Sequence, residues 1–130
     1  MATFPFEIVS PERLLFSGEV EAVKLPGAEG EFQVMAGHAP LLALLGPGVM
    51  EVTGGESKGE KLFIDGGFCD MNGVTCTVLA EAATPLDQLS SDDMKAMIDA
   101  AHKGAEDLEP ADHDEAMRRV AVLHMVHSQL

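Results

Sequence analysis

The stretch "NGVTCTVLA", Asn72 to Ala80, indicates the fold class of the first part of the chain. Asn72-Gly73 is typical of a tight β-hairpin, because both residues tolerate the positive φ of a type I′ turn. From Val74 to Val78, apolar side chains alternate with threonines. Alternation of period two indicates a strand with one buried face. We therefore expect a hairpin whose valines and cysteine face inward and whose threonines face outward.

Further short segments of this kind occupy the chain up to about Pro85. The expected strands are Phe4–Val9, Glu19–Leu25, Glu31–Met35, Val49–Thr53, Lys61–Asp65 and Val74–Ala80. Turn residues such as Gly54-Gly55 separate them, and no helical period intervenes. Strands at this short spacing predict a compact antiparallel sandwich or barrel.

Beyond Leu86 the spacing of the apolar residues becomes helical, at every third or fourth position. The first stripe consists of Met94, Ile98, Ala101, Ala105 and Leu108. Ser90 with Asp93 three residues later fits a capping box, so we expect Ser90 to cap the first helix. Glu109-Pro110-Ala111 is expected to end it.

A second helix is expected from Asp112, its predicted N-cap, to about Ser128, with Glu115 at the N3 position. Its stripe consists of Met117, Val120, Leu123 or His124, and Val126 or His127. The short link predicts a helical hairpin. Because both stripes are thin and rich in alanine and methionine, we expect a weakly held, mobile element. The expected organisation is an antiparallel β-sandwich over residues 1–86 and the hairpin over residues 87–130.

The charge and the apolar content limit the classes of partner. The formal net charge is −14, spread over both halves, whereas nucleic acids and anionic membranes require a basic face. The N-terminus lacks the pattern of a signal peptide. The longest apolar stretch, Ala39 to Leu45, is too short to span a bilayer. We therefore expect a soluble, cytoplasmic protein. Its two cysteines, Cys69 and Cys76, are expected to be buried reduced thiols.

Two groups of histidines could form functional sites, but structural roles are favoured for both. His38 with Asp65 or Asp70 could imitate an acid–base pair, but no nucleophile or electrophile accompanies it, so a packing or partner contact is favoured. His124 and His127, three apart on a helix, could bind a metal. Because no further ligands follow at a recognisable spacing, surface histidines are favoured there.

The glycine-rich stretch from Gly27 to Glu31 does not predict a phosphate site. Glu29 and Glu31 would repel a phosphate, and no lysine follows at the spacing of a P-loop. The glycines are therefore interpreted as turn residues that hold two carboxylates outward.

Six short motifs in one order give the chain a resemblance that extends over its whole length. They are "FSGEVE" (Phe16–Glu21), "GAEGE" (Gly27–Glu31), "GHAPLL" (Gly37–Leu42), "GPG" (Gly46–Gly48), "GG" (Gly66–Gly67) and "VTCTVLAE" (Val74–Glu81). In these motifs the chain resembles the epsilon subunits of F-type ATP synthases. The resemblance implies a flattened antiparallel β-sandwich followed by two C-terminal helices. It also implies a non-catalytic subunit of the central rotor, peripheral at the cytoplasmic face of the inner membrane, which couples proton transport to ATP synthesis.

The resemblance further implies three partners: the gamma subunit, the ring of c subunits and, when the hairpin extends, the catalytic alpha and beta subunits. An extended hairpin would restrain ATP hydrolysis. The implied contacts are Glu29, Glu31 and His38 for the c ring, Ser10, Leu41 and Leu42 for gamma, and Arg118 and Arg119 for alpha/beta. No catalytic, metal or cofactor-binding residue is implied.

The chain departs from the family pattern at two places. Ala36 stands where many members have proline, which predicts a less stiff segment. Leu86-Asp87 begins the pattern through which some members bind ATP, but the arginine and alanine that complete it are missing. ATP binding is therefore expected to be weak or absent. The alternatives left open are a nucleotide-sensing module in which ATP clamps the hairpin, and a small metal-dependent enzyme that uses the histidines.

Overall fold

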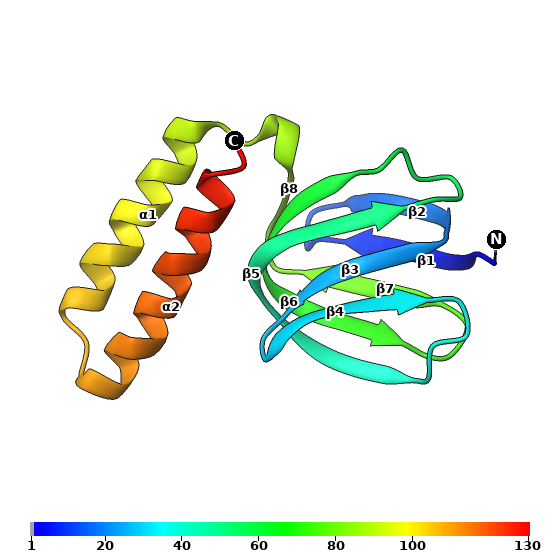
Figure 1. The fold of residues 1–130 in the computed structure, drawn as a ribbon, viewed down its shortest axis with the longest axis horizontal. Coiled ribbons are helices and arrows are strands. Elements are labelled where there is room, and N and C mark those ends of the chain that lie inside the picture. Colours follow the sequence, from blue (N-terminus) through cyan, green and yellow to red (C-terminus); the bar gives the residue numbers. More distant parts are fainter. Residues whose placement is uncertain (1) are drawn as a thin grey trace. The chain divides into compact units, whose positions relative to one another are not determined.

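The computed structural model describes residues 2–130, except for the side chain of residue 111. The chain divides into two compact units, one that ends at Pro85 and one that begins at Leu86 (Figure 1). The strands of the first unit are β1 (Phe4–Val9), β2 (Leu14–Val20), β3 (Ala22–Gly27), β4 (Gly30–Met35), β5 (Leu41–Thr53), β6 (Lys61–Met71), β7 (Cys76–Ala80) and β8 (Ala83–Pro85). The second unit contains the short 3₁₀ helix η1 (Leu86–Gln88) and the helices α1 (Ser91–Glu106) and α2 (Pro110–His127).

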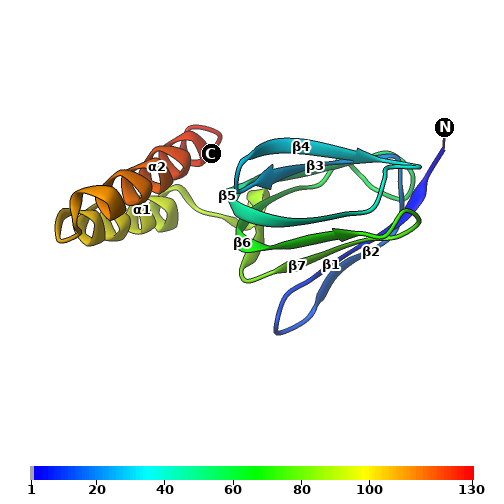
Figure 2. The ribbon, with the colours of Figure 1, turned by 90° about the horizontal axis from the view of Figure 1, so that it is seen from below.

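The first unit is one sheet folded into two layers. The strand order is β2-β1-β7-β6-β5-β3-β4, and β8 also pairs with β6. Figure 2 shows β3 and β4 in one layer and β7, β1 and β2 in the other. The expected β-sandwich is confirmed, with one addition: β1 and β7 are parallel, whereas the other pairs are antiparallel. No hairpin joins β1 to β7, so no tight turn requires them to run in opposite directions.

The long strands β5 and β6 carry the sheet from one layer to the other. They stay paired across the bend, where Leu45 lies opposite Gly67 and Pro47 opposite Asp65. Both strands have glycines there: Gly46-Pro47-Gly48 in β5 and Gly66-Gly67 in β6. Glycine permits the backbone conformations and close approaches that such a bend needs. These motifs therefore bend the sheet and do not end its strands.

This bend explains why the sequence predicts two of the strands too short. The expected strands Val49–Thr53 and Lys61–Asp65 are only parts of β5 and β6, because the glycines and the proline resemble strand ends. The expected strand Glu19–Leu25 spans the break between β2 and β3, and the first five residues of β2 were missed because its apolar residues are consecutive. The last expected strand, Val74–Ala80, begins two residues later, at Cys76. Val74, which was expected to face inward, therefore lies in the turn and is 69% exposed.

The turn between β6 and β7 differs from the expected type I′ turn. Gly73 has a φ of +98°, but no non-glycine residue in the described chain has a positive φ, so Asn72 does not adopt the expected conformation. Its side chain acts as an acceptor instead. The Oδ1 atom of Asn72 accepts hydrogen bonds from the backbone N–H groups of Val74, at 2.9 Å, and Thr75, at 2.8 Å. Asparagine stabilises turns in this way through its short polar side chain.

The core of the first unit fills the space between the two layers. Its buried members are Phe4, Phe6, Ile8, Val20, Val23, Leu25, Val34, Leu45, Met50, Val52, Leu62, Ile64, Cys69, Met71, Cys76, Val78 and Ala80. All of them come from strands of this unit. The sandwich therefore builds its hydrophobic core from its own strands.

We predict from this core that a chain ending at Leu86 folds on its own. Its far-UV circular dichroism should retain the β signal and lose the helical one. In the full-length chain, hydrogen exchange should show the amides of α1 and α2 opening at lower free energy than those of β5 and β6. An insoluble truncated chain, or exchange of both units in one cooperative step, would contradict the prediction.

The connection between β5 and β6 contains a local network around Glu60. Partial burial opposes ionisation of this carboxyl group, but hydrogen bonds from the Ser57 hydroxyl and from the backbone N–H groups of Glu60 and Lys58, together with the Lys58 charge, outweigh it. The pKa of Glu60 is therefore held below its ordinary value. A lowered pKa means that the folded state favours the ionised carboxylate.

We expect the contribution of Glu60 to stability to be complete above its ordinary pKa and to disappear as the pH falls through the lowered value. Glu60→Gln should lower the free energy of unfolding by about 1 kcal/mol at pH 7, because a charge-assisted acceptor is lost. Urea unfolding at a series of pH values should show the two proteins converging in acid. A difference that stays constant down to pH 3 would show that the charge of Glu60 is not responsible.

The second unit confirms the expected helical hairpin and corrects one cap. The Ser90 hydroxyl accepts a hydrogen bond from the backbone N–H of Asp93 at 3.0 Å, so Ser90 caps α1 as expected. The expected cap at Asp112 is wrong, because α2 begins at Pro110 and Glu109 precedes it without a side-chain cap. Proline is favoured at the first helical position, where its fixed φ suits the helix and its missing N–H costs nothing.

The buried faces of the two helices are small. Their buried apolar residues are Met94, Ile98 and Ala105 of α1 and Val120, Leu123 and Val126 of α2. Leu123 and Val126, rather than His124 and His127, therefore complete the stripe of α2. Leu108, which the sequence placed on the stripe of α1, lies beyond that helix and is 44% exposed.

Candidate partner-binding face

Large apolar side chains line up on the outer face of the layer that contains β2, β1, β7, β6 and β5. In the sheet register Leu44 lies opposite Phe68, Phe68 opposite Leu79, Leu79 beside Val9, and Val9 opposite Leu14. Leu44 is 60% exposed, Phe68 46%, Leu79 50% and Leu14 56%, and Val9 is half-buried. We call these five residues the apolar row.

The apolar row exists because these strands are apolar on both faces. The neighbours Ile8, Leu45 and Cys69 point into the core and are 0–5% exposed. A strand with one solvated face ordinarily alternates, whereas consecutive apolar residues are typical of a sheet covered on both sides. Aligned exposed apolar side chains mark interaction sites. The composition of these strands therefore indicates that a partner covers this face.

The structure places the three predicted gamma contacts differently from one another. Leu42 is 71% exposed and extends the apolar face two residues from Leu44 along β5. Ser10 follows Val9 directly, in the turn before β2, where its hydroxyl contacts the backbone of Arg13 at 3.3 Å. Leu41 instead packs against the core. Ser10 and Leu42 thus flank the apolar row, and Leu41 faces away from it.

Glu29 and Glu31, two of the predicted c-ring contacts, lie at the turn between β3 and β4. Glu29 is exposed within the turn. Glu31, expected as the first residue of a strand that ends at Met35, is the second residue of β4. Both side chains are therefore held at the end of the sandwich where β5 and β6 bend, because Gly27 pairs with Leu45 there.

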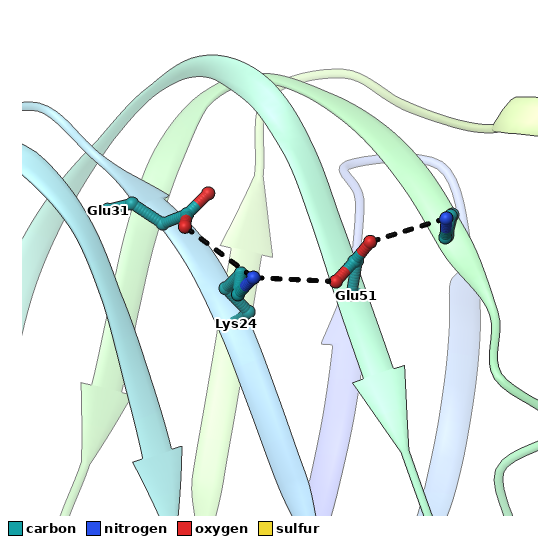
Figure 3. Close-up of polar contacts among 4 residues, drawn as sticks. Lys24, Glu31 and Glu51 are labelled. Atoms are coloured by element: carbon teal, nitrogen blue, oxygen red, sulfur yellow. Dashed lines mark ion pairs between the residues drawn. The ribbon is translucent and has the colours of Figure 1, made fainter. Parts of the chain in front are cut away.

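Glu31 of β4 belongs to a ladder of charges that continues through β3 and β5 to β6. Figure 3 shows its ion pairs. The Lys24 Nζ atom lies 3.7 Å from Glu31 Oε1 and 3.8 Å from Glu51 Oε2. The Lys61 Nζ atom lies 3.4 Å from Glu51 Oε1. Ion pairs this exposed contribute only about 0–1 kcal/mol each. The Glu31 carboxylate can therefore exchange Lys24 for a partner's donor at little cost.

His38 lies at the opposite end of the sandwich from Glu31. It follows β4, and its ring Nδ1 is 2.7 Å from the carbonyl oxygen of Ala39. Because a carbonyl oxygen only accepts, Nδ1 carries the hydrogen, and Nε2 is left as the acceptor of the neutral ring. The length of β4 separates His38 from Glu31, so the structure does not bring together the predicted c-ring set. His38 lies instead near the start of β5, close in sequence to Leu42.

Asp65 and Asp70, the two carboxylates that could pair with His38, lie apart from each other along β6. Asp65 pairs with Pro47 at the bend, whereas Asp70 pairs with Leu42 near the opposite end. The half-buried His38 ring contacts the carbonyl oxygen of its own neighbour, Ala39. This arrangement suits a contact histidine better than a general base.

Two histidines of α2 tie the ends of the hairpin together. His113 Nδ1 lies 2.7 Å from the carbonyl oxygen of Ala105, in the last turn of α1. His127 Nε2 lies 2.8 Å from the hydroxyl of Ser91, the first residue of α1. His127 therefore has a structural partner. Within residues 2–130 no group of three or more His, Cys, Asp or Glu side chains is arranged to hold a metal.

Comparison with known proteins gives this fold a family. The family model described as ATP synthase, Delta/Epsilon chain, beta-sandwich domain matches residues 3–86. The chain belongs to this family. An ATP synthase epsilon chain from Nitrobacter winogradskyi is 40% identical over 130 residues, which is 100% of this chain and 96% of that relative. One from Rhizobium etli is 40% identical over 124 residues, which is 95% of this chain and 91% of that relative.

Two solved structures have the same fold as this chain. A chain in the cryo-EM structure of the Euglena gracilis mitochondrial ATP synthase OSCP/F1/c-ring matches with a TM-score of 0.79 and 21% identity, covering 99% of this chain and 82% of that one. A chain of the Tetrahymena thermophila mitochondrial ATP synthase central stalk and c-ring matches with a TM-score of 0.70 and 15% identity, covering 95% of each.

The apolar row is not predicted from the sequence of this epsilon-family member. None of its five members is among the contacts that the sequence analysis names. The available signal was the pairs of adjacent apolar residues in β1, β5, β6 and β7, such as Leu44-Leu45 and Phe68-Cys69. Which member of each pair faces outward depends on register, which a single strand does not reveal.

The predicted alpha/beta contacts lie on α2. Arg118 is exposed and Arg119 is half-buried, so the two neighbours do not present equal surfaces to a partner. The described part of the chain also includes no helix with the length and apolar character needed to cross a bilayer.

Proposed function

We propose that this chain is a non-catalytic rotor subunit of an F-type ATP synthase, bound to gamma through the apolar row and to the c ring through the turn between β3 and β4. The apolar row carries the proposal. Side chains that cross five strands and remain exposed in the isolated chain need a partner that stays in place. A rotor contact that transmits torque has to be of this permanent kind, and permanent interfaces are the more apolar ones.

Burial of the apolar row would contribute a large part of the binding free energy of such an interface. Burial of a Leu or Phe side chain contributes about 1.5–3 kcal/mol relative to full exposure, and the four outward members begin roughly half exposed. Ser10 and Leu42 flank the row and would lie at the rim of the gamma contact. His38, close to the start of β5, is assigned to this side rather than to the c ring.

Acidic side chains supply the second contact. Glu29 and Glu31 present carboxylates at one end of the sandwich, where they can accept charge-assisted hydrogen bonds. Cytoplasmic loops of membrane proteins are enriched in lysine and arginine, so such a turn complements the loops of a membrane ring. The chain would then lie peripherally at the cytoplasmic face of the inner membrane.

The hairpin is the proposed regulatory element. Its helices have only six buried apolar residues in the part of the chain that the structure describes, so we expect the hairpin to open at low free energy. Extended along gamma, α2 would bring Arg118 and Arg119 to the alpha/beta subunits and restrain hydrolysis. Leu86 and Asp87 lie in η1, before α1 begins, and the arginine of the ATP-binding pattern is missing there. We therefore propose regulation without tight ATP binding.

Binding to gamma and to the c ring tests the proposal directly. The full-length chain, titrated with purified gamma in a calorimeter, should give a saturable complex with a negative heat-capacity change, the mark of apolar burial. ATPase assays of the catalytic complex with full-length and truncated chain test the hairpin. No complex with gamma at micromolar concentrations would reject the proposed rotor role.

Glu31→Lys should weaken coupling between the c ring and the catalytic complex by about threefold to tenfold, as the loss of one exposed charge contact implies. The domain should keep its melting temperature, because Glu31 is 60% exposed and its ion pair contributes little. ATP-driven proton pumping in reconstituted vesicles measures the effect. Glu106→Lys makes the same charge change on α1 and is the control. A marked fall in melting temperature would show that Glu31 is structural.

A further inference from the structure

Cys69 and Cys76 are two buried thiols of the sandwich, and neither takes part in the proposed rotor contacts. Cys69 in β6 lies opposite Val78, and Cys76, the first residue of β7, lies opposite Met71, so the two are diagonal neighbours on antiparallel strands. Both side chains face the core and are 0% exposed. Their Sγ atoms are 3.6 Å apart, within the range of a hydrogen bond between thiols, and both thiols are free.

The contact makes the two thiols chemically unequal. The hydrogen bond from Cys76 lowers the pKa of Cys69, against the opposing effects of burial and of the Asp70 charge. The same hydrogen bond, together with burial, raises the pKa of Cys76. Of the two thiols, Cys69 is therefore the one that ionises more readily, and Cys76 is the one that keeps its proton. A thiolate is the nucleophile in thiol–disulfide exchange.

We propose that Cys69 and Cys76 form a reversible intramolecular disulfide when the chain meets a small disulfide oxidant. In the first step the Cys69 thiolate attacks one sulfur of oxidised glutathione, forms a mixed disulfide and expels one glutathione thiolate. In the second step Cys76 loses its proton to solvent and attacks the Cys69 sulfur, which expels the second glutathione. Two protein thiols are oxidised, and one glutathione disulfide is reduced to two thiols.

The position of the pair gives the oxidant a route that needs only local opening. Cys76 comes directly after the turn from Asn72 to Thr75, and Val74 in that turn is 69% exposed. Diagonal neighbours have Cα atoms about 7–8 Å apart. A disulfide needs about 4.4–6.8 Å, so the strands must shift slightly to close it. Opening of the strand ends at this turn would supply both access and the shift. The reaction should therefore be slow in buffer and faster in urea below the unfolding transition.

The test uses the full-length chain and oxidised glutathione, with remaining thiols alkylated before the intact mass is measured. The expected product has lost two hydrogen atoms, carries neither glutathione nor the alkylating group, and is restored by dithiothreitol. Cys76→Ala should stop at the first step, with one glutathione on Cys69. Cys69→Ala should form its adduct at Cys76 several times more slowly. Fully unfolded wild-type chain, in which both thiols must react, is the control for the reagents.

Three results would overturn the proposal. In the first, the wild-type chain is alkylated at both cysteines even after incubation in sub-denaturing urea. In the second it retains two glutathiones, and in the third it forms a disulfide with a second copy instead of within the chain. The wild-type measurement does not depend on the folding of either variant. Gamma takes no part in the assay, so the outcome is independent of the proposed rotor function.

Discussion

Phe68→Glu is expected to weaken binding of this chain to gamma at least about 100-fold, which corresponds to about 2.7 kcal/mol. Phe68 lies inside the apolar row, with Leu44 and Leu79 opposite it on the neighbouring strands. The substitution removes the aromatic side chain of the row and places a carboxylate where the partner would desolvate it. Aromatic anchors carry a large share of the binding energy of an interface, and an unpaired buried charge adds a further cost.

The fold should tolerate this change, because Phe68 is 46% exposed and points away from the core. Surface substitutions of this kind usually alter stability by about 0.5 kcal/mol or less. Met35→Glu is the matched control, since Met35 is 52% exposed and apolar but lies on β4, outside the apolar row. Calorimetric titration with gamma and thermal unfolding measure both variants. Equal loss of binding in the two would show that the apolar row is not the gamma contact.

Gly67→Ala is expected to destabilise the sandwich by about 3 kcal/mol or more, the range of the larger single-substitution effects. Gly67 has a φ of +138°, a conformation that L side chains rarely adopt. A Cβ atom there would lie 2.2 Å from the carbonyl oxygen of Leu79 and 2.9 Å from Cα of Ala80. Both are backbone atoms of β7, the strand that pairs with β6 at this point, so neither can move without breaking the ladder.

Gly59→Ala separates the two causes of that loss. Gly59 has a φ of +81°, but a Cβ atom there would meet nothing within 4 Å. Its substitution should therefore cost only the conformational strain, about 1–2 kcal/mol. Urea unfolding followed by circular dichroism, performed on both variants, gives the difference. If Gly67→Ala were no more harmful than Gly59→Ala, the close packing of β6 against β7 at the bend would be refuted.

The bend and the apolar row also show where prediction from the sequence failed. Glycine and proline at Gly46-Pro47-Gly48 resemble the end of a strand, because locally they disfavour regular pairing. The ladder continues through them because β6 has its own glycines at the same register. Two segments far apart in sequence have to meet before their glycines can form one bend.

Some properties of the candidate contacts follow from the local sequence, and others depend on how the strands pair. The exposure of Glu29 and Glu31 could be predicted from the sequence, because a glycine-flanked turn keeps its carboxylates exposed whatever packs nearby. Leu41 and Leu42 could not be distinguished, since both are apolar and only the pairing of β5 decides that Leu41 packs inward. His38 was grouped with Glu31 through a family resemblance, and β4 separates the two.

The sequence by itself determined the features that depend on a few neighbouring residues. Period-two and helical spacing set the class of each half, Ser90 set the start of α1, and the change of period marked the end of the sandwich near Pro85. The tertiary structure alone decided which face of each strand is buried, the fold of one sheet into two layers, and the alignment of Leu14, Val9, Leu79, Phe68 and Leu44. Register and burial arise from contacts between distant segments, and local periodicity carries no information about which segments meet.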